Sequence, residues 1–284
     1  MGRATPDPGT SPVPREGVSA AWLVCREVAV FTLGVAVLSG LLSFIALPWI
    51  NLPWWRIFRR CVSIATVIVL WVILSRSHRS LRSVGLVPWR EGKGLLSLGA
   101  VIGLLTPLLL VSAYLVLGIC RVELHPDVVR VWRTTLVFLP GAGLVALLEE
   151  FIFRGYLLRV LWDGSKLLAV AGSSLAYGLV HLRPNVGWNI NLPDVIGLTI
   201  LGLVLASITL QTKQLSLAIG LHAGLAYWAR VNKLFLSFSP ESARWLVGDN
   251  RLINGVITWC VLICVGLAIG IWCSRTRVNV EGGR

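Results

Sequence analysis

The sequence predicts an all-α membrane protein, a bundle of about eight transmembrane helices. Of its 284 residues, 56% are hydrophobic and only 14% are charged, and the mean hydropathy is +0.78. This is far more apolar than a soluble domain of similar length. The apolar residues are gathered in long runs, and a run of roughly 20 is what a helix needs to cross a bilayer. We therefore expect a polytopic membrane protein.

The positive charge of the chain has an explanation in its membrane topology. A net charge of +13 would suggest a nucleic-acid partner in a soluble protein. Here the Lys and Arg residues lie in clusters between the apolar runs, as expected for topology signals and contacts with lipid headgroups. We expect the lipid bilayer as a partner and no nucleic acid, and the sequence predicts no particular oligomeric state.

Four candidate spans occupy the first part of the chain. Pro48 and Trp49 mark the interface at the end of the first span, and Pro107 should kink the third. Pro140 to Gly143 should loosen the first turns of the fourth span and admit water. These spans are Val28 to Ile50, about Ile57 to Ser75, Leu95 to Cys120, and a run that starts near Thr134 and continues to Leu158.

Four more candidate spans follow. A loop rich in Asn, Pro and Trp, Leu182 to Pro193, comes after the fifth span, and a tight turn from Gln211 to Gln214 joins the sixth and seventh. The spans are Ser165 to His181, Asp194 to Gln211, Leu215 to Ala229 and Ile253 to Cys273.

The chain divides into a flexible N-terminal segment (1–27), a transmembrane domain (28–274, with its motifs within 136–228) and a basic C-terminal tail (275–284). With eight spans both termini share a side, which carries 15 of the 26 Lys and Arg residues. The positive-inside rule favours that side as cytoplasmic. We expect a multi-pass protein of the cell inner membrane with cytoplasmic termini.

The six cysteines of the chain include no CxxC pair and suggest neither disulfides nor zinc.

The fourth span carries three ionisable residues, Glu149, Glu150 and Arg154. Charged groups at membrane depth are costly and usually face a bundle interior or a water-filled cavity. In a helix, Glu150 and Arg154 are i,i+4 neighbours in the favourable order for an ion pair. Glu149 is turned by about 100° and has no such partner, so it is left to titrate. Alternatively, the helix end reaches the interface, where Arg154 snorkels and both acids are solvated.

Two histidines lie on other spans. His181 ends the fifth span, one turn after Tyr177, and His222 is in the middle of the seventh. Carboxylates and histidines together can activate water, stabilise an oxyanion or bind a metal. Each histidine could instead be structural, His181 as an interfacial residue and His222 as a buried one.

These three blocks resemble the CAAX prenyl protease and bacteriocin-processing family (CPBP) of intramembrane proteases. The family motif EExxxR corresponds to EEFIFR, with Glu149, Glu150 and Arg154. YGLVH provides Tyr177, where the family usually has Phe, and His181. HAGLA provides His222 but has Ala226 where the HxxxN motif has asparagine. The blocks come in the family order, over about Leu136 to Trp228.

The resemblance implies a role for each of these residues. It assigns Glu149 and His181 to the activation of the attacking water, and Glu150 and Arg154 to its support. His222 would stabilise the oxyanion, a task that Ala226 cannot share as an asparagine would. The loop after His181 contains asparagines that could compensate, namely Asn185, Asn189 and Asn191.

No cofactor is expected. The chain lacks the HExxH spacing that places two zinc ligands on one helix face, so we favour glutamate-activated water, with zinc as the alternative. It also has no Walker loop or dinucleotide fingerprint, and no Ser or Cys lies three or four residues from His181 or His222.

Three functions are consistent with the sequence. The first is an intramembrane endopeptidase that cleaves a lipidated or membrane-anchored peptide or protein. The second is a catalytically lapsed immunity or peptide-binding membrane protein, for which Ala226 is the best argument. The third is a proton-coupled transporter, although the chain lacks paired broken helices in two matching halves.

Overall fold

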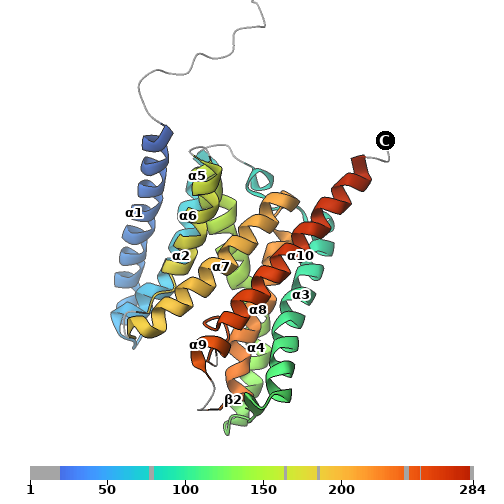
Figure 1. Cartoon of the computed structure of the whole chain (residues 1–284). Helices are drawn as coiled ribbons and strands as arrows, with labels where there is room; N and C mark the ends of the chain where they lie inside the picture. The colour runs from blue at the N-terminus through green and yellow to red at the C-terminus, as the bar shows by residue number, and fades with distance from the viewer. Residues whose placement is uncertain are drawn as a thin grey trace, which may run out of the picture.

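The structure is a computed structural model that describes residues 20–76, 80–162, 165–183, 186–239, 243–249 and 251–281. It is a helical bundle (Figure 1), as predicted. The helices are α1 (Ala20–Ala46), α2 (Trp54–Arg76), α3 (Trp89–Val116), α4 (Val128–Glu150), α5 (Leu158–Trp162), α6 (Lys166–Leu179), α7 (Trp188–Thr212), α8 (Ser216–Val231), α9 (Arg244–Val247) and α10 (Val256–Glu281). A π-helix, η3 (Phe151–Leu157), joins α4 to α5, and short 3₁₀ helices are η1 (Leu47–Trp49), η2 (Leu81–Val84) and η4 (Asn232–Leu234).

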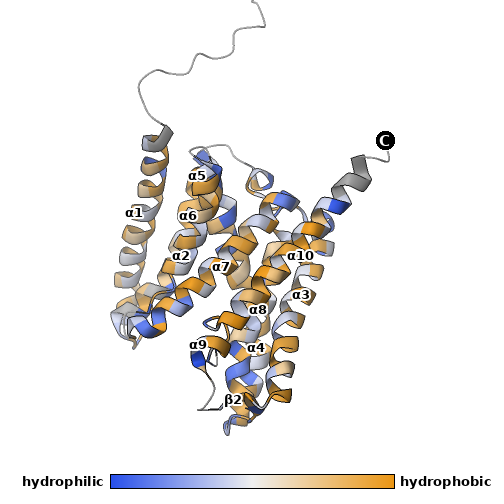
Figure 2. Cartoon of the chain, viewed as in Figure 1, coloured by the Kyte–Doolittle hydropathy of each residue, from blue (hydrophilic) through white to orange (hydrophobic). Residues whose placement is uncertain are grey.

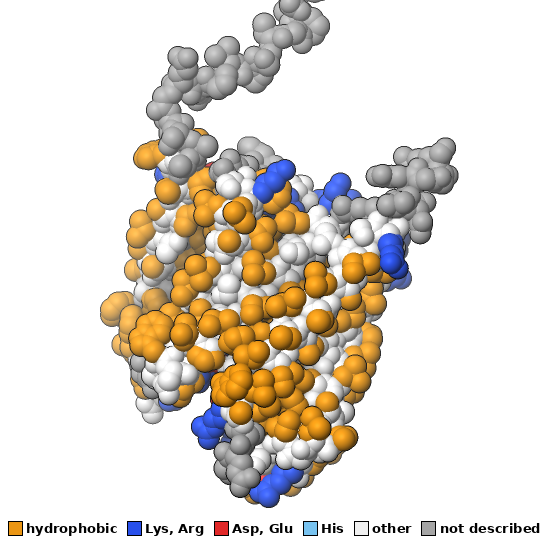
Figure 3. Space-filling view, viewed as in Figure 1, with side chains coloured by type: hydrophobic (Ala, Val, Ile, Leu, Met, Phe, Trp, Pro, Cys, Tyr) orange, Lys and Arg blue, Asp and Glu red, His pale blue; other side chains and the backbone are white. Residues whose placement is uncertain are grey.

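Six stretches among the described residues are long and apolar enough to cross a membrane, and they include α1, α2, α3, α4 to α5, α7 and α10. Each of the eight predicted spans corresponds to a helix, but α6 has only 14 residues and α8 only 16. The predicted number of eight transmembrane spans is therefore not confirmed. Figure 2 shows hydrophobic residues along the middle of the helices, and Figure 3 shows Lys and Arg at the two ends of the apolar face. The chain is a multi-pass integral membrane protein.

The centre of the bundle is α8, which packs against α3 and α4. Glycines on the two facing surfaces bring the backbones of α3 and α8 into contact: a Cβ on Gly99 or Gly103 would collide with carbonyl oxygens of α8, and one on Gly220 with a carbonyl of α3. Small residues permit such close helix packing within membranes. This packing fixes the height of α8, and therefore of His222, in the bundle.

The helices at both ends of the chain extend beyond the predicted spans. Helix α1 begins at Ala20, so residues 20–27 are helical, and the rest of the predicted flexible segment lies outside the described residues. Helix α10 likewise continues through most of the predicted tail, to Glu281. Charged residues ended the apolar runs in both places, but they do not prevent a helix from continuing beyond the hydrocarbon core.

Other corrections concern helix interiors and loops. The predicted third span extended to Cys120, but α3 ends near Gly118, whose φ of +68° is a left-handed conformation typical of helix ends. Cys120 instead begins β1 (Cys120–Val122), which pairs antiparallel with β2 (Leu236–Phe238). Pro193, placed in a loop, lies inside α7.

The predicted opening of the fourth span was also wrong. Helix α4 is continuous through Pro140, and the irregular backbone begins only after the two acids, in η3. A proline removes one backbone donor, which leaves the carbonyl of Leu136 without its helical partner. The change to π-helix places one extra residue in a turn and alters which side chains after Glu150 face the bundle.

Figure 1 shows that α1 begins and α10 ends at the same end of the bundle, as predicted, and that α9 and β2 lie at the other end.

Candidate active site

The acidic motif forms a buried ion pair. Glu150, the last residue of α4, and Arg154, in η3, are both fully buried, and the Arg154 guanidinium donates to Glu150 Oε1 at 2.8 Å. Arg154 also donates to the carbonyl of Gly202 at 3.2 Å, and its guanidinium stacks on the Tyr177 ring, 4.6 Å from its centre. The alternative in which Arg154 snorkels to the interface is therefore wrong.

His222 joins this pair to the second acid. Its Nδ1 lies 2.9 Å from Glu150 Oε1, and its Nε2 lies 3.7 Å from Glu149 Oε2. A carboxylate accepts hydrogen bonds, so His222 carries a proton on Nδ1. The neutral ring then has a free electron pair on Nε2, which faces the hydroxyl of Tyr177 at 3.3 Å. In this form, Tyr177 donates to His222.

His181, in the turn that follows α6, approaches Glu149. Its Nδ1 lies 2.8 Å from the backbone carbonyl of Tyr177. Because a carbonyl only accepts, Nδ1 carries the proton, and the electron pair of the neutral ring is on Nε2. That nitrogen lies 3.8 Å from Glu149 Oε2. The hydrogen bond thus orients a basic nitrogen toward the carboxylate.

Glu149 lies between the two histidines. Its side chain is about one quarter exposed, whereas Glu150 is fully buried. Oε2 of Glu149 is buried and has no hydrogen-bond partner among the described residues. An unpaired carboxylate oxygen and the two imidazole nitrogens therefore converge within less than 4 Å, a geometry that can accept protons from a small donor placed between them.

These groups open into a cavity of about 260 Å³. Glu149, Tyr177, His181 and His222 line it together with Ala226 and mostly apolar residues of α3, α7, α8 and α10. Three basic residues also line it: Arg230, Lys233 and Arg251. Burial lowers the pKa of Lys233, and the nearby positive charges of Arg251 and Arg230 lower it further. The cavity therefore combines a catalytic-type cluster with apolar walls and a cationic region.

Comparison with known protein families gives one match. Residues 131–228 match the family model described as type II CAAX prenyl endopeptidase Rce1-like. The chain is thus similar to this family over about a third of its length, and we call residues 131–228 its Rce1-like domain. The resemblance to the CAAX protease family is thereby confirmed. A search of curated proteins and a search of solved structures gave no match.

The Rce1-like domain includes every residue that the sequence motifs singled out. It begins in α4 and ends in α8, so it covers Glu149, Glu150, Arg154, His181 and His222. The structure brings all five into one cluster. The cavity wall extends beyond the matched segment, because α3 and α10 contribute Pro107 and Leu262.

Two of the three suggested substitutes for the missing asparagine do not line the cavity. The side chain of Asn191 bonds to backbone groups of Arg183 and Val186 and holds the loop before α7. Neither Asn191 nor Asn189 lines the cavity, and Asn185 lies outside the described residues. A hydroxyl donor that does lie beside His222 is that of Tyr177, a position where the sequence motif indicates only an aromatic ring.

The side chains at the cavity are of types that can also bind a metal ion. Zinc takes nitrogen and oxygen ligands such as these. Nε2 of His222, however, already faces a hydroxyl group, and in the part of the chain that the structure describes no group of three or more His, Cys, Asp and Glu side chains is arranged to hold a metal.

Proposed function

We propose that the protein is an intramembrane endopeptidase in which Glu149 activates a water molecule for attack on a peptide carbonyl. The observation that carries this proposal is the position of Glu149: an unpaired carboxylate oxygen in a cavity, 3.8 and 3.7 Å from the Nε2 atoms of His181 and His222. A carboxylate in such a place can act as a general base, which contributes about 10² to 10⁴ in rate.

The proposed reaction moves one proton. A water molecule donates one hydrogen to Glu149 and is oriented by a second hydrogen bond to Nε2 of His181. Its oxygen attacks the carbonyl carbon as Glu149 takes the proton, and Glu149 then delivers that proton to the leaving amine. This is the ordinary double use of one carboxyl as base and then acid.

The oxyanion requires a hydrogen-bond donor. Nδ1 of His222 is engaged with Glu150, so His222 can donate through Nε2 only when the ring is protonated at both nitrogens. The negative charge of Glu150, held in place by Arg154, stabilises that imidazolium. We therefore propose Glu150 and Arg154 as positioning residues and His222 as the oxyanion donor, with the hydroxyl of Tyr177 next to it.

We infer that the substrate is a lipidated or membrane-anchored peptide. The apolar walls provided by α7 and α10 suit a lipid or an apolar side chain, whereas Arg230, Lys233 and Arg251 suit an anionic group such as a free carboxyl terminus. Because the pKa of Lys233 is lowered, its ammonium group loses its proton as the pH rises through that pKa, and part of the positive charge of the cavity is then lost. Binding of an anionic peptide end should weaken in the same pH range.

A lapsed, peptide-binding protein is the second candidate, and Ala226 favours it because an alanine in the cavity wall provides no donor. The two candidates differ in turnover. The test is incubation of the purified protein in detergent with prenylated and transmembrane peptides, followed by mass spectrometry of the products. Cleavage at one defined bond supports the protease, whereas tight binding with no product, even at high protein concentration, contradicts it.

A further inference from the structure

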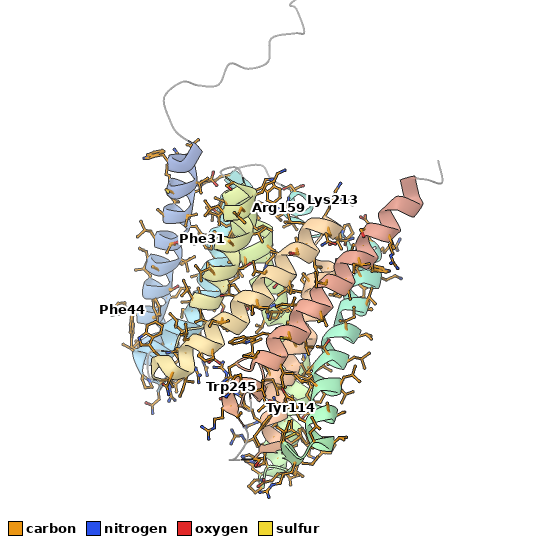
Figure 4. All side chains as sticks on the ribbon, viewed as in Figure 1. Phe31, Phe44, Tyr114, Arg159, Lys213 and Trp245 are labelled. Carbon is orange, nitrogen blue, oxygen red and sulfur yellow. The ribbon has the colours of Figure 1, made fainter. Side chains whose placement is uncertain are left out.

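A second cavity, of about 590 Å³, lies on the other side of the ion pair, and no site residue other than Arg154 lines it. Its walls come from η2, from the segment that follows the acidic motif and from the end of α7. Figure 4 shows two of its basic residues, Arg159 and Lys213, at the end of the bundle where α1 begins and α10 ends. The two cavities have no lining residue in common, so this cavity is distinct from the one that contains Glu149.

The charged side chains that line this cavity are all basic. Arg82, Arg154, Arg159 and Lys213 line it, and none of its described lining residues is acidic. The charge of Arg154 is neutralised by its ion pair with Glu150, and that of Arg82 by its ion pair with the exposed Glu91. Lys213 is exposed and has no carboxylate partner within the described residues. The cavity therefore keeps a net positive charge.

Two residues of this cavity also carry buried donors that have no partner in the described part of the chain. Thr209 is 3% exposed, and its hydroxyl has no hydrogen-bond partner in the described part of the chain. Nε of the fully buried Arg154 likewise has none there. Both residues line the cavity. A buried donor without a partner is costly, so an acceptor bound in the cavity would remove that cost.

The position of the cavity indicates which acceptor fits. Trp162, which also lines it, is of the type that gathers at the headgroup level of a bilayer, and Leu158 and Leu210 provide apolar surface beside the charges. Basic pockets between transmembrane helices are places where anionic headgroups bind. We propose that this cavity binds the phosphate group of an anionic membrane lipid, with Lys213 and Arg159 as its main cationic contacts.

The test uses the full chain reconstituted in nanodiscs of phosphatidylcholine, with or without phosphatidylglycerol, and native mass spectrometry to count the retained lipids. Wild type should retain phosphatidylglycerol in preference to phosphatidylcholine. The double variant Arg159→Gln/Lys213→Gln should bind it roughly 30-fold more weakly, at about five-fold for each basic side chain. Lys213→Gln alone, at an exposed site where folding is not at risk, should weaken binding about five-fold.

The matched control is Arg90→Gln/Lys93→Gln, which removes two exposed charges from the first two turns of α3. Both residues lie outside the cavity. This control variant should retain the lipid as wild type does. Equal retention by wild type, control and both cavity variants would overturn the proposal. Inorganic phosphate distinguishes the source of the ligand: if it raises the unfolding temperature of lipid-free wild type but not of Lys213→Gln, and no lipid is retained, the cavity takes free phosphate and the lipid assignment is wrong.

Discussion

Removal of Arg154 should destabilise the protein far more than removal of an arginine from an exposed pair. Arg154→Met leaves Glu150 as a fully buried carboxylate whose one remaining partner among the described residues is His222. Loss of one partner from a buried ion pair costs about 3 to 5 kcal/mol. Removal of both charges, in Glu150→Gln/Arg154→Met, leaves no stranded charge, and should cost less than the sum of the two single changes by about 0.5 to 3 kcal/mol.

The assay is equilibrium unfolding of the purified variants in one detergent, and the control is Arg82→Gln. Arg82 forms a pair with Glu91 at 2.7 Å, the same type of contact, but the two side chains are 62% and 49% exposed. An exposed pair contributes about 0 to 1 kcal/mol. If Arg154→Met costs no more than Arg82→Gln, or if the double variant is simply additive, the buried pair does not support the site.

Three further outcomes are expected. Tyr177→Phe should fold normally and lower the cleavage rate about three- to ten-fold, the value of one hydrogen bond, as measured by steady-state kinetics; an unchanged rate would show that the hydroxyl 3.3 Å from His222 has no part in the reaction. Ala226→Asn should raise the rate or leave it unchanged, because residue 226 lines the cavity one turn from His222, and misfolding of this variant would contradict an open cavity there. Dialysis against a strong chelator should leave activity unchanged, and one zinc per chain whose removal and return switch activity off and on would make zinc part of the site.

Much of the site was predictable because its residues carry charge in an apolar sequence. The pairing of Glu150 with Arg154 followed from their helical spacing, and the structure has that contact. The different directions of the Glu149 and Glu150 side chains also followed from the rotation of about 100° between consecutive residues of a helix. His181 and His222 were harder to place, since only tertiary packing determines whether residues on three helices meet.

The parts that were missed depend on interactions that no local pattern contains. The π-helix after Glu150 has no clear sequence marker, and the proline and glycines of Pro140 to Gly143 indicated an irregularity in the wrong place. The Tyr177 hydroxyl became meaningful only when α8 placed His222 opposite it. The close contact of α3 with α8 could have been suspected from the small residues Gly99, Gly103, Gly220 and Gly224, which recur four apart on each helix.

The most direct test of the proposed mechanism compares the cleavage rate of wild type with that of Glu149→Gln on a peptide that wild type cleaves. The amide keeps the size of the side chain but cannot accept a proton, so the rate should fall by about 10² to 10⁴ while the unfolding transition in detergent stays the same. Glu123→Gln, an exposed change outside the cavity, should retain the wild-type rate. A Glu149→Gln protein that cleaves as fast as wild type would contradict the account, because no water activated by Glu149 would then be needed.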